Sequence, residues 1–167
     1  MKTTKTITTA ALIAAVYAVL TIIIAPLSYG AIQLRFSEAL TILPFFTPIA
    51  IPGLTIGCII ANLFGGYGIY DIVIGSLATL FSSITTYYIG KYLKGKVAKF
   101  LAPLPPVIFN AVFVGAIITM YLNPENVLIA FSLNALTVGV GEFIACYLLG
   151  IPLLYSLEKL NIKSKLK

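Results

Sequence analysis

The stretch SYGAIQLRFSEALTILPFFTP, residues 28–48, places a charged pair, Arg35 and Glu38, within a strongly apolar chain. Its polar first part separates an apolar run that ends at Pro26 from a second apolar run that begins at Glu38. Polar connections between long apolar runs are typical of membrane proteins, in which each run crosses the bilayer. We therefore expect this stretch to decide how the chain enters the membrane and where its polar site lies.

The overall composition indicates an integral membrane protein. Of the 167 residues, 60% are hydrophobic and 10% are charged, and the mean hydropathy is +1.05. In a typical soluble domain, about a quarter of all residues are charged. Because a transmembrane helix needs roughly 20 apolar residues, this length allows about six helices. We predict a single all-α bundle of six transmembrane helices that occupies residues 1–167.

Proline, glycine and lysine clusters mark the predicted ends of the six helices. The helices are expected at about residues 7–25, 38–49, 53–64, 71–92, 103–122 and 127–154. Pro44, Pro48 and Pro52 predict that the second helix is kinked or broken. Polar and apolar residues alternate over residues 28–37, which favours a short hairpin or lid between the first two helices.

The basic residues predict the orientation of the bundle. Ten of the eleven Lys and Arg residues lie at the two termini and in the loop after the fourth helix, and Arg35 alone lies on the other side. The positive-inside rule then predicts that both termini are cytoplasmic and that residues 28–37 are extracellular. We expect a multi-pass protein of the plasma membrane, in which the net charge of +6 reflects topology and not a nucleic-acid ligand.

Polar residues within the predicted helices are the candidates for function, because a charge at the centre of the bilayer costs about 2.5–3.5 kcal/mol on insertion scales. A rise of about 1.5 Å per residue predicts one outer layer and one layer below the midplane. The outer layer contains Arg35, Glu38, Asn62, Asp71 and Asn134, and the lower layer contains Asn110 and Glu142. Tyr67 and Phe45 are expected to add aromatic walls at the outer depth, with Phe45 on the same helix face as Glu38.

Each of these polar residues also has a purely structural explanation. Glu38 and Asp71 open helices, where a carboxylate is favoured by free N–H groups. Arg35 and Glu38 are three residues apart and can pair across one turn. Asn62 is suited to a helix end, while Asn110 and Glu142 are suited to a hydrogen bond between helices.

Together, these residue types favour a pocket for a small molecule. Carboxylates, amides and aromatic rings at one depth suit a flat, hydrogen-bonding ligand of the purine kind, including a cationic one. The chain has no histidine and only two cysteines, both within apolar runs. It shows no catalytic pair, metal-ligand cluster or phosphate-binding loop. We therefore expect neither an enzyme nor a metal or cofactor.

The first helix carries a face of small residues, Ala10, Ala14 and Ala18, at four-residue spacing. Small residues four apart allow the backbone of another helix to approach closely. This face is expected either to pack inside the bundle or to dock a partner subunit.

Four blocks of sequence resemble the QueT family, the queuosine-precursor substrate-binding (S) components of energy-coupling-factor (ECF) transporters. The blocks are RFSEALTILPFFTP (35–48), ANLFGG with DIVIGSLATL (61–66 and 71–80), LAPLPPVIFNA (101–111) and GEFIACYLLGIPLL (141–154). The resemblance implies an S component that captures 7-aminomethyl- or 7-cyano-7-deazaguanine from outside the cell. It further implies partners, namely a transmembrane coupling subunit and two cytoplasmic ATPases, and release of substrate by toppling of the S component in the membrane.

Carried onto this chain, the resemblance implies roles for individual residues. Glu38 would bind the guanine-like edge, and Glu142 or Asp71 would be the second carboxylate, facing an aminomethyl cation if that is the ligand. Asn62, Asn110 and Asn134 are the amide candidates, Arg35 would position Glu38, and the alanine face would dock the coupling subunit. Two alternatives stay open: a self-sufficient channel or ion-coupled carrier, and an S component for another vitamin.

Overall fold

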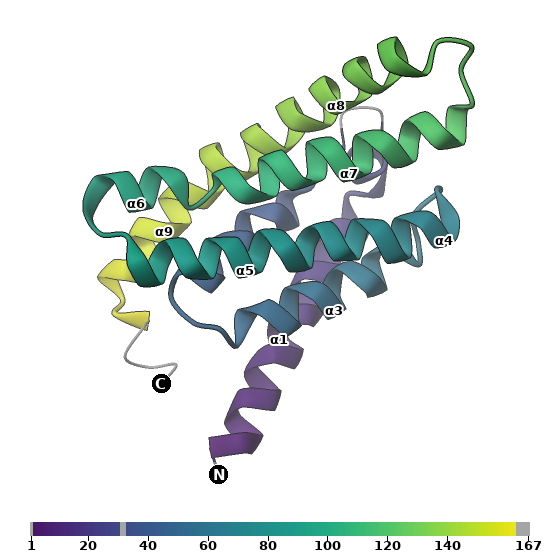
Figure 1. The fold of residues 1–167 in the computed structure, drawn as a ribbon. Coiled ribbons are helices and arrows are strands. Elements are labelled where there is room, and N and C mark those ends of the chain that lie inside the picture. Colours follow the sequence, from purple (N-terminus) through teal and green to yellow (C-terminus); the bar gives the residue numbers. More distant parts are fainter. Residues whose placement is uncertain (1, 31–32, 163–167) are drawn as a thin grey trace.

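Residues 2–30 and 33–162 are described by the computed structural model, and all of the regular structure in them is helical. The elements in chain order are α1 (Lys2–Ile23), α2 (Ala25–Ser28), η1 (Phe36–Phe45), α3 (Ala50–Asn62), α4 (Gly68–Tyr70), η2 (Asp71–Gly75), α5 (Ser76–Tyr92), α6 (Gly95–Leu101), α7 (Leu104–Leu122), α8 (Val127–Phe143), η3 (Ile144–Leu149) and α9 (Gly150–Lys159). η1 is a 3-10 helix, while η2 and η3 are π-helical turns that run directly into α5 and α9. The long helices lie side by side, with α6 and α9 at one end and α4 and the turn after α7 at the other (Figure 1).

Four helical stretches are long and apolar enough to cross a membrane. They are Thr3–Ile23, Gly68–Tyr92, Gly95–Leu122 and Val127–Lys159. η1 and α3 are apolar but have only 10 and 13 residues, so each is roughly 20 Å long. The prediction of an all-helical membrane protein is confirmed, and four of the expected crossings coincide with these stretches. The number of crossings and the side on which the termini lie stay predictions.

The second predicted helix differs from the expected α-helix in type and position. Residues 36–45 form tight 3-10 turns that contain Pro44, and the chain then breaks before α3 begins at Ala50. η1 lies very close to α5, because a Cβ added to Gly90 would come within 2.9 Å of the Phe45 Cα. The glycine thus permits a contact between backbones that any larger residue would prevent.

The connection before η1 is not the expected hairpin in the part of it that the structure describes. Residues 33–35 are irregular and form no strand, Arg35 has an extended backbone, and η1 begins at Phe36. Gln33 has a positive φ of 53°, which is uncommon for a residue with a side chain. Residues 31–32, at the tip of the expected lid, lie outside the described residues. The lysine-rich loop also differs from expectation, since it contains the short helix α6.

α1 packs on α3 along the predicted face of small residues. A Cβ added to Gly53 would lie 2.8 Å from the Ala10 carbonyl oxygen, and one added to Gly57 would lie 2.8 Å from that of Ala14. Ala14 and Ala18 are each only 4% exposed. The structure therefore shows the packing alternative, because α3 of the same chain lies against this face. Docking of a partner subunit on this face stays a prediction.

Candidate functional site

Two carboxylates meet inside the bundle, one from η1 and one from the end of α8. Ligand atoms of Glu38, Glu142 and Cys146 all lie within 4.8 Å of one another. Glu38 and Glu142 are 1% and 2% exposed, and the Oε2 atom of Glu38 has no hydrogen-bond partner. We call this group the inner centre. An unpartnered carboxylate oxygen in an apolar interior is costly, and such an atom indicates a position that a ligand donor can occupy.

Cys146 and two further residues, Tyr17 and Asn110, hold the carboxylates of the inner centre in place. The Tyr17 hydroxyl of α1 donates to Oε1 of Glu38, and the Cys146 thiol donates to Oε2 of Glu142 over 3.6 Å. Asn110, from α7, is buried beside both carboxylates and interacts with each. The wide π-turn η3 begins two residues after Glu142, and π-turns often accompany functional sites in helices.

The inner centre corrects the expectation that Glu38 and Glu142 lie in different layers. Gln33 and Arg35 are already buried, at 1% and 4% exposure, so the chain enters the bundle before η1 begins. The predicted depth treated Glu38 as a surface residue, and it therefore placed Glu38 too close to the surface of the membrane. Asn110 and Glu142 do lie together as expected, but Glu38 lies with them.

A second polar group, the outer centre, surrounds Arg35. Its guanidinium forms an ion pair with Asp71, with Nη2 and Oδ2 3.6 Å apart. Nη1 donates to Asn62 Oδ1 at 3.1 Å, Nη2 to Gln33 Oε1 at 2.9 Å and Nε to the Ser28 carbonyl at 3.3 Å. Asn62 in turn donates to the Asp71 carbonyl at 2.8 Å. This network ties the segment before η1 to α3 and η2.

The partner of Arg35 differs from the expected one. Arg35 pairs with Asp71 and not with Glu38, whose side chain is held by Tyr17 instead. Asp71 is also tightly enclosed, because a Cβ on Gly75 would lie 2.8 Å from its Oδ1 and one on Gly65 would lie 3.0 Å from its Oδ2. The two glycines make room for this carboxylate, neither of whose oxygens has a hydrogen-bond partner, and the Arg35–Asp71 ion pair links the segment before η1 to η2.

Two other predicted site residues, Asn134 and Tyr67, have contacts elsewhere in the bundle. Asn134 Nδ2 donates to Thr119 Oγ1 at 2.9 Å, which joins α8 to α7. The ring of Tyr67 packs edge-on against Tyr121 of α7, with 5.2 Å between centroids. None of the interactions among the described residues connects Asn134 or Tyr67 to either polar centre.

Phe45 lies at the opposite end of η1 from Glu38, where its ring packs against Phe46 with 5.3 Å between centroids. A 3-10 helix has three residues per turn, so residues seven apart lie about 120° apart around its axis. Phe45 therefore does not share a face with Glu38. The expectation of a shared face assumed an α-helix and is corrected here.

Comparison with known proteins identifies a family whose match covers the residues of both centres. The chain matches the profile of the QueT transporter family over residues 7–159. This chain belongs to the QueT transporter family. A relative from Lactococcus lactis subsp. cremoris (strain MG1363), named queuosine precursor transporter QueT, is 43% identical over 84 residues. That match covers 48% of this chain and 49% of the relative, so the chain spans about half the length of the curated relative it matches. No solved structure matches the chain.

Membership of the QueT family classifies the chain as a transporter and not as an enzyme. With its long apolar helices, it is a multi-pass protein of the plasma membrane. In this QueT-family chain, the two polar centres contain six of the predicted site residues: Arg35, Glu38, Asn62, Asp71, Asn110 and Glu142.

Sequence reasoning missed three contributors to the centres of this QueT-family protein. Tyr17 is the one tyrosine within the first apolar run, and that position was a signal that it needs a buried acceptor. Gln33 belongs to the stretch expected as a lid at the surface, but it is buried beside Arg35. Cys146 lies within an apolar run, and the only sequence signal that places it beside Glu142 is their four-residue spacing on one helix.

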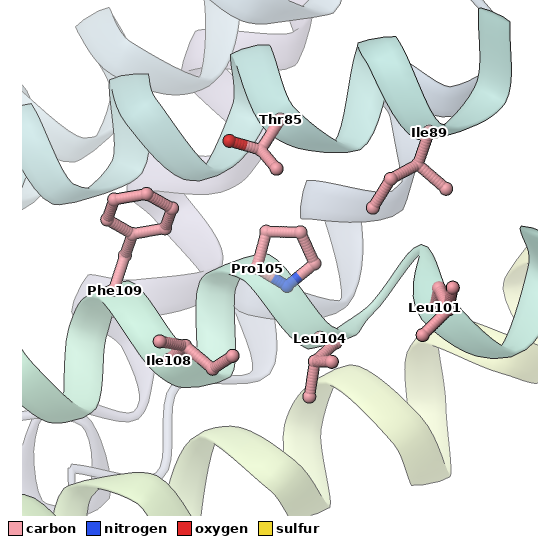
Figure 2. Close-up of a pocket in the computed structure, with 7 residues that line it drawn as sticks. All are labelled: Thr85, Ile89, Leu101, Leu104, Pro105, Ile108 and Phe109. Atoms are coloured by element: carbon pink, nitrogen blue, oxygen red, sulfur yellow. The ribbon is translucent and has the colours of Figure 1, made fainter. Parts of the chain in front are cut away.

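A separate apolar cavity of about 210 Å³ lies between α5 and the α6–α7 junction (Figure 2). It is lined by Thr85, Ile89, Leu101, Leu104, Pro105, Ile108 and Phe109. Its only side-chain hydroxyl, that of Thr85, already donates to the Phe81 carbonyl at 2.8 Å. A polar ligand would give up its hydrogen bonds to water and find no replacement in this lining, so the cavity does not fit a polar substrate.

Proposed function

We propose that this QueT-family chain is the S component of an ECF importer and that it captures a queuosine precursor, 7-aminomethyl- or 7-cyano-7-deazaguanine. The observation that carries the proposal is the inner centre, where Glu38 has a buried carboxylate oxygen without a partner. A deazaguanine offers several N–H donors, and a buried carboxylate is the strongest neutral-pH acceptor that a protein has for them. The name of the Lactococcus lactis relative supports the substrate class.

We further propose six crossings with both termini in the cytoplasm. In this arrangement η1 and α3 are the second and third crossings, and residues 28–35 lie at the extracellular side. The contact of Phe45 with Gly90, next to Lys91, supports it, because the end of η1 then lies at the lysine-rich side of the membrane. The connection before η1 would be the segment that closes over the substrate.

Transport requires partners, and we propose a coupling subunit and two cytoplasmic ATPases. The sequence has no phosphate-binding glycine loop, so ATP would be used by other subunits. Because α3 covers the face of Ala10, Ala14 and Ala18, we assign docking to the neighbouring row of α1. Thr8, Ala11 and Ala15 form that row, and all three are exposed.

A binding measurement on the purified chain tests the proposal. Isothermal titration calorimetry in detergent is expected to show binding of a deazaguanine without ATP or any other subunit. Glu38→Gln is expected to weaken that binding by about 1.5–3 kcal/mol, because a charge-assisted hydrogen bond is lost. Glutamine still offers Tyr17 an oxygen acceptor, so the fold should be retained.

The control for this variant is Glu125→Gln, which removes a carboxylate from the exposed turn between α7 and α8. It should bind like the wild type. Wild-type affinity in Glu38→Gln would instead give Glu38 a structural role only. Uptake of the compound by vesicles that contain this chain and no ATPase would replace the S-component proposal with that of a self-sufficient carrier or channel.

A further inference from the structure

The charge balance of the interior leaves the inner centre without a cation. Arg35 is the one buried cation among the residues that the structure describes, and it stands against the buried carboxylates of Glu38, Asp71 and Glu142. Its ion pair is with Asp71, and its three nitrogens donate to other acceptors of the outer centre. Asn110 offers the inner carboxylates N–H groups but no charge. Two carboxylates this close repel each other strongly in an apolar interior.

The spacing of the two carboxylates suits a single nitrogen. A nitrogen that lies about 2.8 Å from each of two oxygens can join oxygens up to roughly 5.6 Å apart. The ligand oxygens of Glu38 and Glu142 are within 4.8 Å. They are therefore too close to hold opposite edges of one bicyclic ring, and close enough to share one ammonium group with its three donors. The unpartnered Oε2 of Glu38 is the independent sign that a donor is missing there.

We infer that the inner centre binds a protonated primary amine of the ligand, held between Glu38 and Glu142. The inference rests on the proposed function and names the substrate within its class. The 7-aminomethyl compound carries an ammonium group, whereas the 7-cyano compound ends in a nitrogen that only accepts hydrogen bonds. The chain thus selects the aminomethyl compound. Glu38 then binds the amine, and not the guanine-like edge that the resemblance implied.

The test compares the affinities of the two compounds for the purified full chain in detergent micelles. The wild type is expected to bind the 7-aminomethyl compound roughly 10- to 100-fold more tightly than the 7-cyano compound, as charge-assisted pairing in a buried site predicts. Glu142→Gln should bring this affinity ratio close to 1, mainly by weakening the binding of the aminomethyl compound. Glu125→Gln should keep the wild-type ratio. Melting temperatures of the ligand-free variants report whether they are folded.

The wild-type ratio decides the inference even if Glu142→Gln does not fold. Equal affinities, or tighter binding of the cyano compound, would overturn the ammonium site and leave the S-component proposal standing. Binding of neither compound would overturn the proposed function as well. A stoichiometric divalent metal in the purified wild type that is lost in Glu142→Gln would also overturn the inference, since Glu38, Glu142 and Cys146 would then be metal ligands.

Discussion

Substitution of Gly57 by alanine is predicted to push α1 away from α3. The new Cβ would lie 2.8 Å from the Ala14 carbonyl oxygen, 2.9 Å from the Tyr17 Cβ and 3.0 Å from the Ala14 Cα. Carbon contacts relax to about 3.5 Å or more, so the α1 backbone has to move by roughly 0.6 Å. Forcing one extra methyl group into a packed contact costs about 1–3 kcal/mol. Because Tyr17 holds Glu38, the same shift should weaken substrate binding.

Gly139→Ala is the matched control for this variant. Gly139 is also helical, but its added Cβ would meet only the Ala111 Cβ, at an ordinary 3.4 Å. Both substitutions gain the same helix propensity, so the difference between them isolates the close contact. At about 2–4 °C per kcal/mol, Gly57→Ala should melt roughly 2–12 °C below Gly139→Ala when followed by circular dichroism in detergent.

Equal melting temperatures for the two variants would refute this reasoning. They would mean that α1 is not packed on α3 as described. The face of Ala10, Ala14 and Ala18 would then be free again for a partner subunit. Reduced stability in both variants would point instead to a general effect of alanine at helical glycines.

Three further predictions concern the outer centre, the exposed row of α1 and the lysine-rich end of the bundle. Asp71→Asn leaves Arg35 buried without a counter-charge and should lower the free energy of unfolding by about 3–5 kcal/mol, so wild-type stability would contradict a buried ion pair. Ala11→Leu should leave ligand affinity unchanged and abolish co-purification with the coupling subunit; retained assembly would move docking to another surface. Lys99→Ala breaks a 2.6 Å pair with Glu158 at the protein surface and should cost less than about 1 kcal/mol in thermal unfolding, which a large loss of stability would contradict.

Several features of the site were accessible from sequence because they depend on residue type alone. A carboxylate or amide within an apolar helix must face a partner, and this singled out Glu38, Asn110 and Glu142 without any coordinates. The pairings were less accessible. Arg35 was matched to Glu38 by three-residue spacing, yet the structure pairs it with Asp71, thirty-six positions along the chain.

The predicted depths of these residues were wrong for a related reason. Helix rise converts position into depth only if the start of the helix and its type are known. Arg35 is buried before η1 begins, η1 is a 3-10 helix, and the last helix contains a π-turn. Each of these departures changes the position or direction of the residues that follow. Phe45 therefore lies farther from Glu38 than predicted, and Glu142 lies closer to it.

The amino-acid sequence by itself determined the apolar helical class of this protein, its lysine-rich side and its family, since these follow from composition and from blocks of local sequence. Only the tertiary structure decided that Glu38 and Glu142 share one buried centre, that Arg35 forms its ion pair with Asp71, and that the alanine face of α1 is covered by α3. The physical reason is that helices without long loops are positioned by close backbone contacts, at Gly53, Gly57 and Gly90 in this chain. Such contacts depend on the shapes of both surfaces, and neither helix specifies its partner alone.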